Sequence, residues 1–122
     1  SRKKRKFNYK NIPTAVFSNP NLASIGYTEN EAKRMFKKIR VYKSQFRSLK
    51  LSMTNSSEKT FIKLITDSKS DKILGLHYVG ENAAEIVQGF SVAIVNGLTK
   101  KQLDKTMGIH PSSAEEVVTL KI

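Results

Sequence analysis

The sequence predicts an α+β domain in which helices pack against an antiparallel β-sheet. Strand-like runs dominate the first part of the chain and helical ones the last, an order that favours α+β over a doubly wound parallel fold. The clearest pair of runs, 60–66 and 73–79, flanks a polar turn over 67–71 and predicts an antiparallel hairpin. From residue 83 onward, apolar residues recur at spacings of three and four, which predicts a helix packed on this sheet.

The length and composition are those of one globular domain. A chain of 122 residues suits a single core, and 39% hydrophobic with 26% charged residues is near the globular average. Residues 1–11 are basic and lack apolar periodicity, so we expect a basic linker or disordered N-terminus there and one domain over 12–122. The chain begins with Ser1 rather than Met, which suggests a fragment.

The elements before the hairpin are predicted from turn residues and caps. The apolar run 12–17 has its proline near the start, as edge strands tolerate, and a loop over 18–21 follows. Thr28 and Glu31 have the spacing of a capping box, which predicts a helix over 29–37.

Further elements complete the predicted order of strand, helix, three strands and then helices. Imperfect alternation indicates a strand over 41–46, and polar residues indicate an irregular loop over 47–58. The apolar face of the long helix consists of Ala83, Ile86, Val87, Phe90, Ala93, Ile94 and Gly97. Asn96 and Gly97 are typical of a helix end, and Thr99 then begins a short helix through about Met107.

Several classes of site are excluded by composition and motif. The chain contains no cysteine, so it has no disulfide and no thiolate nucleophile of its own. His77 and His110 do not have the spacing of zinc ligands, and we expect no metal site. The sequence lacks the glycine-rich nucleotide loops and the nucleophile elbow. It also has no apolar run that could span a bilayer, so we expect no membrane contact and a cytoplasmic location.

The net charge of +12 raises the possibility of a polyanion partner. One basic block runs over 2–6, and a second consists of Lys33, Arg34, Lys37, Lys38 and Arg40. A solvated surface plus a linker explains both blocks more simply. A small basic nucleic-acid-binding protein is the less favoured alternative, because the sequence has no recognisable nucleic-acid-binding motif.

The C-terminal segment contains the one plausible general acid/base of the chain. Histidine is the side chain best suited to exchange protons at physiological pH, and a carboxylate bonded to one ring nitrogen of His110 would fix the tautomer while the other nitrogen exchanges a proton. Pro111 disfavours a helical turn at His110, which places the histidine before a helix and Glu115 in its first turn. The pair could therefore shuttle a proton to and from a thiol.

A purely structural explanation fits the same residues. Ser112 with Glu115, and Ser113 with Glu116, both have capping-box spacing, which would account for serine and glutamate without catalysis. Spacing alone leaves the two explanations open. His77 lies within a strand-like run, and we assign it no catalytic role.

Five motifs together resemble the pyridine nucleotide-disulfide oxidoreductase family, most closely its glutathione-reductase branch. They are I-P-T-A-V-F-S at 12–18, I-G-Y-T-E-N-E-A at 25–32, G-L-H at 75–77, A-A-E-I-V-Q-G-F at 83–90, and I-H-P-S-S-A-E-E-V-V-T-L at 109–120. The resemblance covers nearly everything after the linker. It implies a C-terminal dimerisation domain with an α+β fold and an antiparallel sheet.

The resemblance also implies a function. His110 would be the active-site acid/base and Glu115 its orienting carboxylate, both offered to the disulfide and flavin of a second copy, and Glu116 would touch substrate or the interface. The full-length parent would be a homodimer that uses FAD and NADPH to reduce glutathione disulfide. The fragment alone would bind neither cofactor and would be inactive, because the redox cysteines and dinucleotide fingerprints belong to upstream parts. The alternatives are a non-catalytic self-association module, or the same domain of trypanothione reductase or dihydrolipoamide dehydrogenase.

Overall fold

A five-stranded antiparallel sheet forms the centre of the domain. The computed structural model describes residues 11–47 and 59–121. Its strands are β1 (Thr14–Val16), β2 (Leu22–Gly26), β3 (Ile39–Phe46), β4 (Thr60–Asp67) and β5 (Ile73–Val79). They lie in the order β1-β2-β5-β4-β3, with every neighbouring pair antiparallel. The predicted fold class and the predicted hairpin are confirmed.

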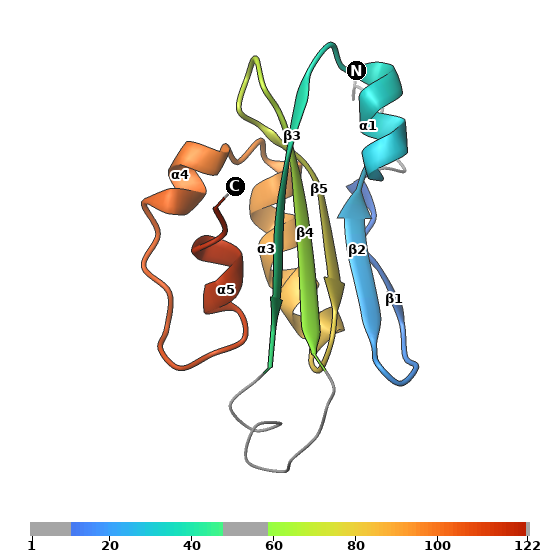
Figure 1. Cartoon of the computed structure of the whole chain (residues 1–122), viewed down its shortest axis with the longest axis vertical. Coiled ribbons are helices and arrows are strands. Elements are labelled where there is room, and N and C mark those ends of the chain that lie inside the picture. Colours follow the sequence, from blue (N-terminus) through green and yellow to red (C-terminus); the bar gives the residue numbers. More distant parts are fainter. Residues whose placement is uncertain (1–10, 48–58, 122) are drawn as a thin grey trace, which may run out of the picture.

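Helices lie on both sides of this sheet. They are α1 (Glu29–Met35), α3 (Ala83–Val95), α4 (Lys100–Asp104) and α5 (Glu115–Val118). Figure 1 shows α3, α4 and α5 on one side of the sheet and α1 on the other, near the end of β2. The side chain of Thr28 accepts a hydrogen bond from the amide of Glu31, and the Glu31 carboxylate accepts one from the amide of Thr28, so the predicted capping box is present.

The main core lies between the sheet and the three helices α3, α4 and α5. One row of facing residues, Ile25, Leu76, Leu64 and Tyr42, crosses four strands and is buried. The helices cover it with Ala83, Val87, Ile94, Leu103, Val117 and Val118. Burial of these apolar side chains is the main stabilising term and holds the short α5 in place.

Strand β2 is an element that the sequence did not predict. Its residues Ala23, Ser24 and Gly26 are small and weakly strand-forming, so local propensity gives little signal. The strand forms because it pairs with β1 on one side and β5 on the other. Gly26 is required where it lies, since its φ is +83° and a Cβ there would be 2.1 Å from the carbonyl oxygen of Leu74.

Other boundaries differ by a few residues from expectation. The first helix ends at Met35 and the short helix at Asp104, both earlier than predicted, while β3 begins at Ile39, earlier than predicted. The irregular loop expected over 47–58 and the linker expected over 1–11 fall almost wholly outside the described residues.

Candidate active site

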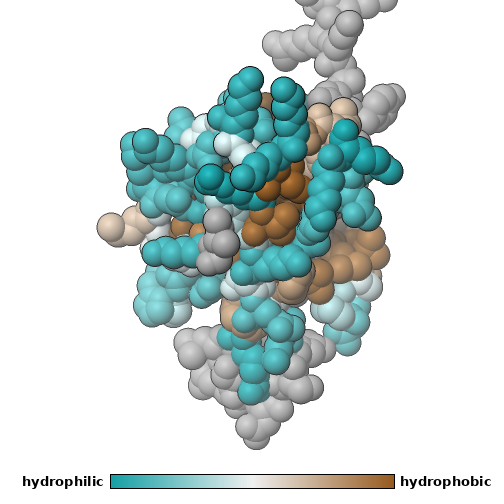
Figure 2. Space-filling view, turned by 45° about the horizontal axis from the view of Figure 1, so that its top comes forward, coloured by the Kyte–Doolittle hydropathy of each residue, from teal (hydrophilic) through white to brown (hydrophobic). Residues whose placement is uncertain are grey.

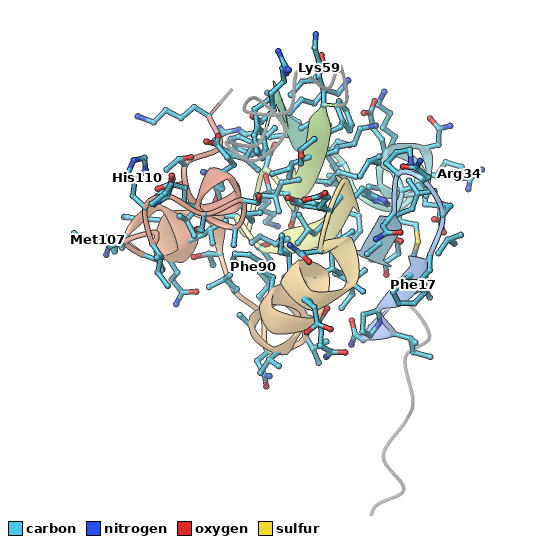
Figure 3. The ribbon with its side chains drawn as sticks, turned by 90° about the horizontal axis from the view of Figure 1, so that it is seen from below. Phe17, Arg34, Lys59, Phe90, Met107 and His110 are labelled. Carbon is cyan, nitrogen blue, oxygen red and sulfur yellow. The ribbon has the colours of Figure 1, made fainter. Side chains whose placement is uncertain are left out.

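His110 lies on an exposed loop between α4 and α5. The buried side chain of Leu103 anchors α4 to the core, and the chain then leaves the core through Met107 and Ile109, which are 93% and 80% exposed. The side chain of His110 is itself 82% exposed. Figure 3 shows Met107 and His110 together at this side of the domain, with Phe17 on the opposite side.

Glu115 lies in a much more fixed position. It begins α5, whose Val117 and Val118 are buried in the core, and Leu120 just after the helix is buried too. The Glu115 side chain is only 19% exposed. An exposed ring is thus held against a carboxylate that the core fixes in place.

The two side chains form a short hydrogen bond. Nδ1 of His110 and Oε1 of Glu115 are 2.7 Å apart. An ionised carboxylate can only accept, so Nδ1 carries a hydrogen and donates it. This arrangement fixes the tautomer and leaves Nε2 as the nitrogen that can exchange a proton with a partner.

Ser112 links the His110 loop to α5, and its hydrogen bonds test whether helix capping explains the serine and the glutamate. Its Oγ accepts a hydrogen bond from the amide of Glu115 at 3.2 Å and donates one to the carbonyl of Ile109 at 2.6 Å. The N-cap of α5 is Ala114, which makes no side-chain cap hydrogen bond, so Ser112 braces the turn before the helix and the Ser112–Glu115 capping box is not formed. The carboxylate of Glu115 bonds to His110 instead.

Gly108 is a site residue that the sequence reasoning missed. A Cβ at this position would be 2.6 Å from Cβ of Glu115 and 3.0 Å from Cγ2 of Val118. The loop backbone packs directly on α5 because residue 108 has no side chain. A glycine two residues before the histidine was the available signal, but its meaning depends on a contact that spacing does not reveal.

Glu116 does not join the pair. Among the hydrogen bonds of the described residues, none connects Glu116 with His110. Burial raises the pKa of the Tyr78 hydroxyl, and the nearby charge of Glu116 adds to this. The nearby hydroxyls of Ser113 and Thr60 oppose that rise more strongly than Glu116 adds to it, but the Tyr78 hydroxyl is buried and makes no hydrogen bond within the described residues.

His77 lies on the other face of the sheet. It is half-buried on β5, and its Nε2 is 2.9 Å from the carbonyl oxygen of Tyr27, to which it donates. Its neighbours across the sheet are Ser24 and Lys63, with no carboxylate in the row. This fits the structural role predicted for it.

No metal centre or membrane helix is found in the part of the chain that the structure describes. Acidic and histidine side chains there form no group of three able to hold a metal ion, and none of the helices is long and apolar enough to cross a bilayer. The basic block over 2–6 lies outside the described residues. In the second block, Lys33 pairs with Glu29, which also pairs with Lys63, and these bonds hold the pKa of Glu29 below its usual value.

A shallow apolar groove runs beside the histidine–glutamate pair. We call it the α3 groove, and its lining consists of Glu85, Ile86, Gly89, Phe90 and Ala114. Ala114 directly precedes Glu115, so the groove adjoins the start of α5. Phe90 lies between the His110 side and the Phe17 side of the domain (Figure 3).

Comparison with known proteins gives a consistent picture. The family model described as "Pyridine nucleotide-disulphide oxidoreductase, dimerisation domain" matches residues 12–121. Glutathione reductase from a Nostoc species is 48% identical over 120 residues, which cover 97% of this chain and 26% of that protein. The chloroplastic/mitochondrial glutathione reductase of Pisum sativum is 45% identical over 113 residues, which cover 93% of this chain and 20% of that protein.

A solved structure shares the fold. The HOCl-induced flavoprotein disulfide reductase RclA from Escherichia coli superposes with a TM-score of 0.80 at 26% sequence identity, covering 91% of this chain and 26% of that one. The chain thus spans about a quarter of the length of the proteins it matches.

Proposed function

The chain belongs to the pyridine nucleotide-disulphide oxidoreductase dimerisation-domain family, and from that premise we propose that it supplies an acid/base pair to a glutathione-disulfide reductase. His110 is the acid/base and Glu115 its orienting carboxylate. The observation that carries the proposal is the 2.7 Å bond from Nδ1 of a largely exposed ring to a largely buried carboxylate.

The chemistry of the pair follows from which nitrogen is free. Glu115 accepts the hydrogen bond from Nδ1–H. Nε2 is therefore the nitrogen that would exchange a proton with a partner outside this chain. When a thiolate leaves a disulfide, a proton from Nε2 lets it depart as a neutral thiol, and the Glu115 carboxylate balances the charge of the ring before that transfer. Positioned proton transfer of this kind contributes about 10²–10⁴-fold in rate.

The sulfur for this reaction lies in another part of the parent or in a second copy. The chain has no cysteine, and its described residues form no dinucleotide-binding loop. FAD and NADPH, which we place in other parts of the parent, would supply the electrons. The chain by itself is therefore expected to reduce nothing. The substrate, glutathione disulfide, is inferred from the names of the relatives.

The α3 groove supports a homodimer. Gly89 lies inside a helix, where glycine costs about 1 kcal/mol relative to alanine. A Cβ at this position would meet nothing within 4 Å, so the domain itself gives no steric reason for a glycine. Close approach of a second backbone would give that reason. We assign the groove to the same surface of a second copy, as two-fold symmetry requires.

The catalytic proposal is tested by replacing Glu115 with Gln in the full-length parent. The amide can keep the ring in place but cannot balance its charge, so turnover of glutathione disulfide should fall by about tenfold or more. Reduction of the flavin by NADPH should be unchanged. Glu81→Gln is the matched control, since it removes a carboxylate outside the pair. Wild-type turnover in the Glu115→Gln variant would contradict the catalytic role. It would favour the alternative of a self-association module without catalysis.

We propose Glu116 as a contact to substrate or to the dimer interface. Its half-buried position in the first turn of α5 suits such a contact. Glu116→Gln should then raise KM more than it lowers kcat, in contrast to Glu115→Gln.

The homodimer is tested by Gly89→Lys with Gln88→Lys as control. Gln88 is exposed and does not line the α3 groove, since its side chain points about 100° around the helix from Gly89. Analytical ultracentrifugation should show monomers for Gly89→Lys and dimers for Gln88→Lys and the wild type. A wild-type chain that stays monomeric at high concentration would contradict the assignment.

A further inference from the structure

The hydroxyl of Tyr78 is a polar atom inside the apolar core. Hydrophilic side chains cover much of the face of the domain shown in Figure 2, where water can bond to them. Tyr78, in contrast, is 1% exposed, and its sheet neighbours Ala23 and Ile62 are buried with it on the face that α3 covers. Its hydroxyl makes no hydrogen bond within the described residues. Thr66 and Ser68 share this property, but they lie at the other end of β4.

Packing of the core does not account for this oxygen. Phenylalanine has the same shape as tyrosine without the hydroxyl, and replacing an unpaired buried polar group by an apolar one is neutral or stabilising. Buried polar groups are nearly always paired, so an unpaired one needs a reason outside the packing. The ring of Tyr78 is thus explained by the fold, whereas its hydroxyl is not.

The hydroxyl lies beneath the start of α5. The hydroxyls of Ser113 and of Thr60 are near it, and the charge of Glu116 reaches it. Thr60 belongs to β4, whereas Ser113 and Glu116 belong to the segment that forms the candidate active site. Tyr78 therefore connects the centre of the sheet with that segment.

Ser113 and Glu116 have no partner for their side chains within the described residues. Their spacing is that of a capping box, but the N-cap of α5 is Ala114 and the helix has no side-chain cap. Both side chains are half-buried. A serine hydroxyl can accept one hydrogen bond and donate another, whereas an ionised carboxylate can only accept. A chain of bonds from a phenol through a serine to a carboxylate would therefore satisfy all three groups.

We propose that Tyr78 is a positioning residue for Glu116 and acts through Ser113 when substrate is bound. The Tyr78 hydroxyl then donates to Oγ of Ser113, and the Ser113 hydroxyl donates to the Glu116 carboxylate. Rotation of the Ser113 and Glu116 side chains between staggered rotamers is the movement required. A bond to a charged acceptor is stronger than one between neutral groups, so the chain of bonds holds the carboxylate from the core side. This inference rests on the proposed contact of Glu116 with substrate.

Steady-state kinetics of the full-length parent test the role of the hydroxyl. Tyr78→Phe removes one oxygen and should raise the KM for glutathione disulfide by about three- to tenfold, while kcat stays within about twofold of wild type. Ser113→Ala should have the same effect. Tyr42→Phe is the matched control, since it removes the same atom from another buried tyrosine, on β3, and should leave KM unchanged. A wild-type KM in Tyr78→Phe overturns the proposal.

A double variant tests whether Tyr78 acts through Glu116. Glu116→Ala removes the last acceptor of the chain of bonds, so adding Tyr78→Phe to it should raise KM no further. Effects on KM that multiply would mean that the two residues act independently, and the proposal then fails. It also fails if Glu116→Ala keeps the wild-type KM, because Glu116 then does not contact substrate. The catalytic role of Glu115 is judged by kcat rather than KM, so the two proposals fail separately.

Discussion

The two histidines of this chain are held by similar bonds in opposite surroundings. His77 lies half-buried on a central strand and donates from Nε2 to a backbone carbonyl. His110 lies on an exposed loop and donates from Nδ1 to a carboxylate. A carbonyl orients a ring but cannot balance a positive charge, whereas a carboxylate does both. The comparison teaches that the partner of a histidine, more than its burial, separates a structural ring from one suited to proton transfer.

The largest expected effect is on turnover in the full-length parent. His110→Ala should lower kcat for disulfide reduction by about 10²–10⁴-fold, because it removes the group proposed to donate the proton. His77→Ala should keep turnover within a few-fold of wild type. Steady-state kinetics with glutathione disulfide measure both variants. Equal losses of turnover would contradict the assignment of a catalytic role to His110 and a structural role to His77.

The effect on stability should run in the reverse order. His77→Ala removes the donor to the carbonyl of Tyr27 and the packing of the ring, at a cost of about 1–2 kcal/mol. His110→Ala removes an exposed side chain and should change the free energy of unfolding by less than about 0.5 kcal/mol. Urea unfolding of the 122-residue chain at pH 7 compares them. A larger loss for His110 would mean that its bond to Glu115 is chiefly structural.

A smaller effect is expected at Ser112. Ser112→Ala removes the hydrogen bonds to Glu115 and Ile109, and loss of such side-chain-to-backbone bonds costs about 1 kcal/mol or less when the site is open to water. The His110 loop should loosen while the His77 region stays unchanged. Two-dimensional NMR of the chain should show shifts confined to residues near 108–116, and shifts spread through β5 would contradict this.

The smallest effect concerns Tyr78, which follows His77 in sequence but faces α5. Its hydroxyl is buried without a partner among the described residues, so Tyr78→Phe should leave stability at pH 7 unchanged or slightly higher.

The same substitution should change how the free energy of unfolding depends on pH in alkaline solution. Burial raises the pKa of Tyr78 above its ordinary value of 10.0. A raised folded-state pKa gives stability that is present below the unfolded pKa and lost as pH rises through the folded one. As pH rises above about 10, the wild type should therefore lose more stability than Tyr78→Phe, as urea unfolding at increasing pH would show. Identical pH curves would place the hydroxyl in contact with water.

Much of the fold followed from local pattern. The hairpin of β4 and β5 was predicted because both strands are rich in β-branched and apolar residues and flank a polar turn. Helix α3 was predicted because its apolar residues repeat with helical spacing. Strand β2 was missed because its small residues carry almost no strand preference, and it forms only through pairing with strands distant in sequence.

The site divides in the same way. The sequence places His110 before a helix and Glu115 within its first turn, but spacing allowed the carboxylate either to cap the helix or to hold the ring. That choice depends on how Gly108 lets the loop pack on α5 and on how Ser112 bonds to the loop, and both are contacts across a turn.

By itself the sequence determined the fold class, the elements with strong local periodicity, and the identity of the acid/base candidates, because these depend on neighbours a few residues apart. Only the tertiary structure decided that Glu115 bonds to His110, that Gly89 faces an open groove, and that the Tyr78 hydroxyl lies beneath Ser113 and Glu116. Each of these depends on which residues are brought together across strands and helices, and burial of the core sets that arrangement.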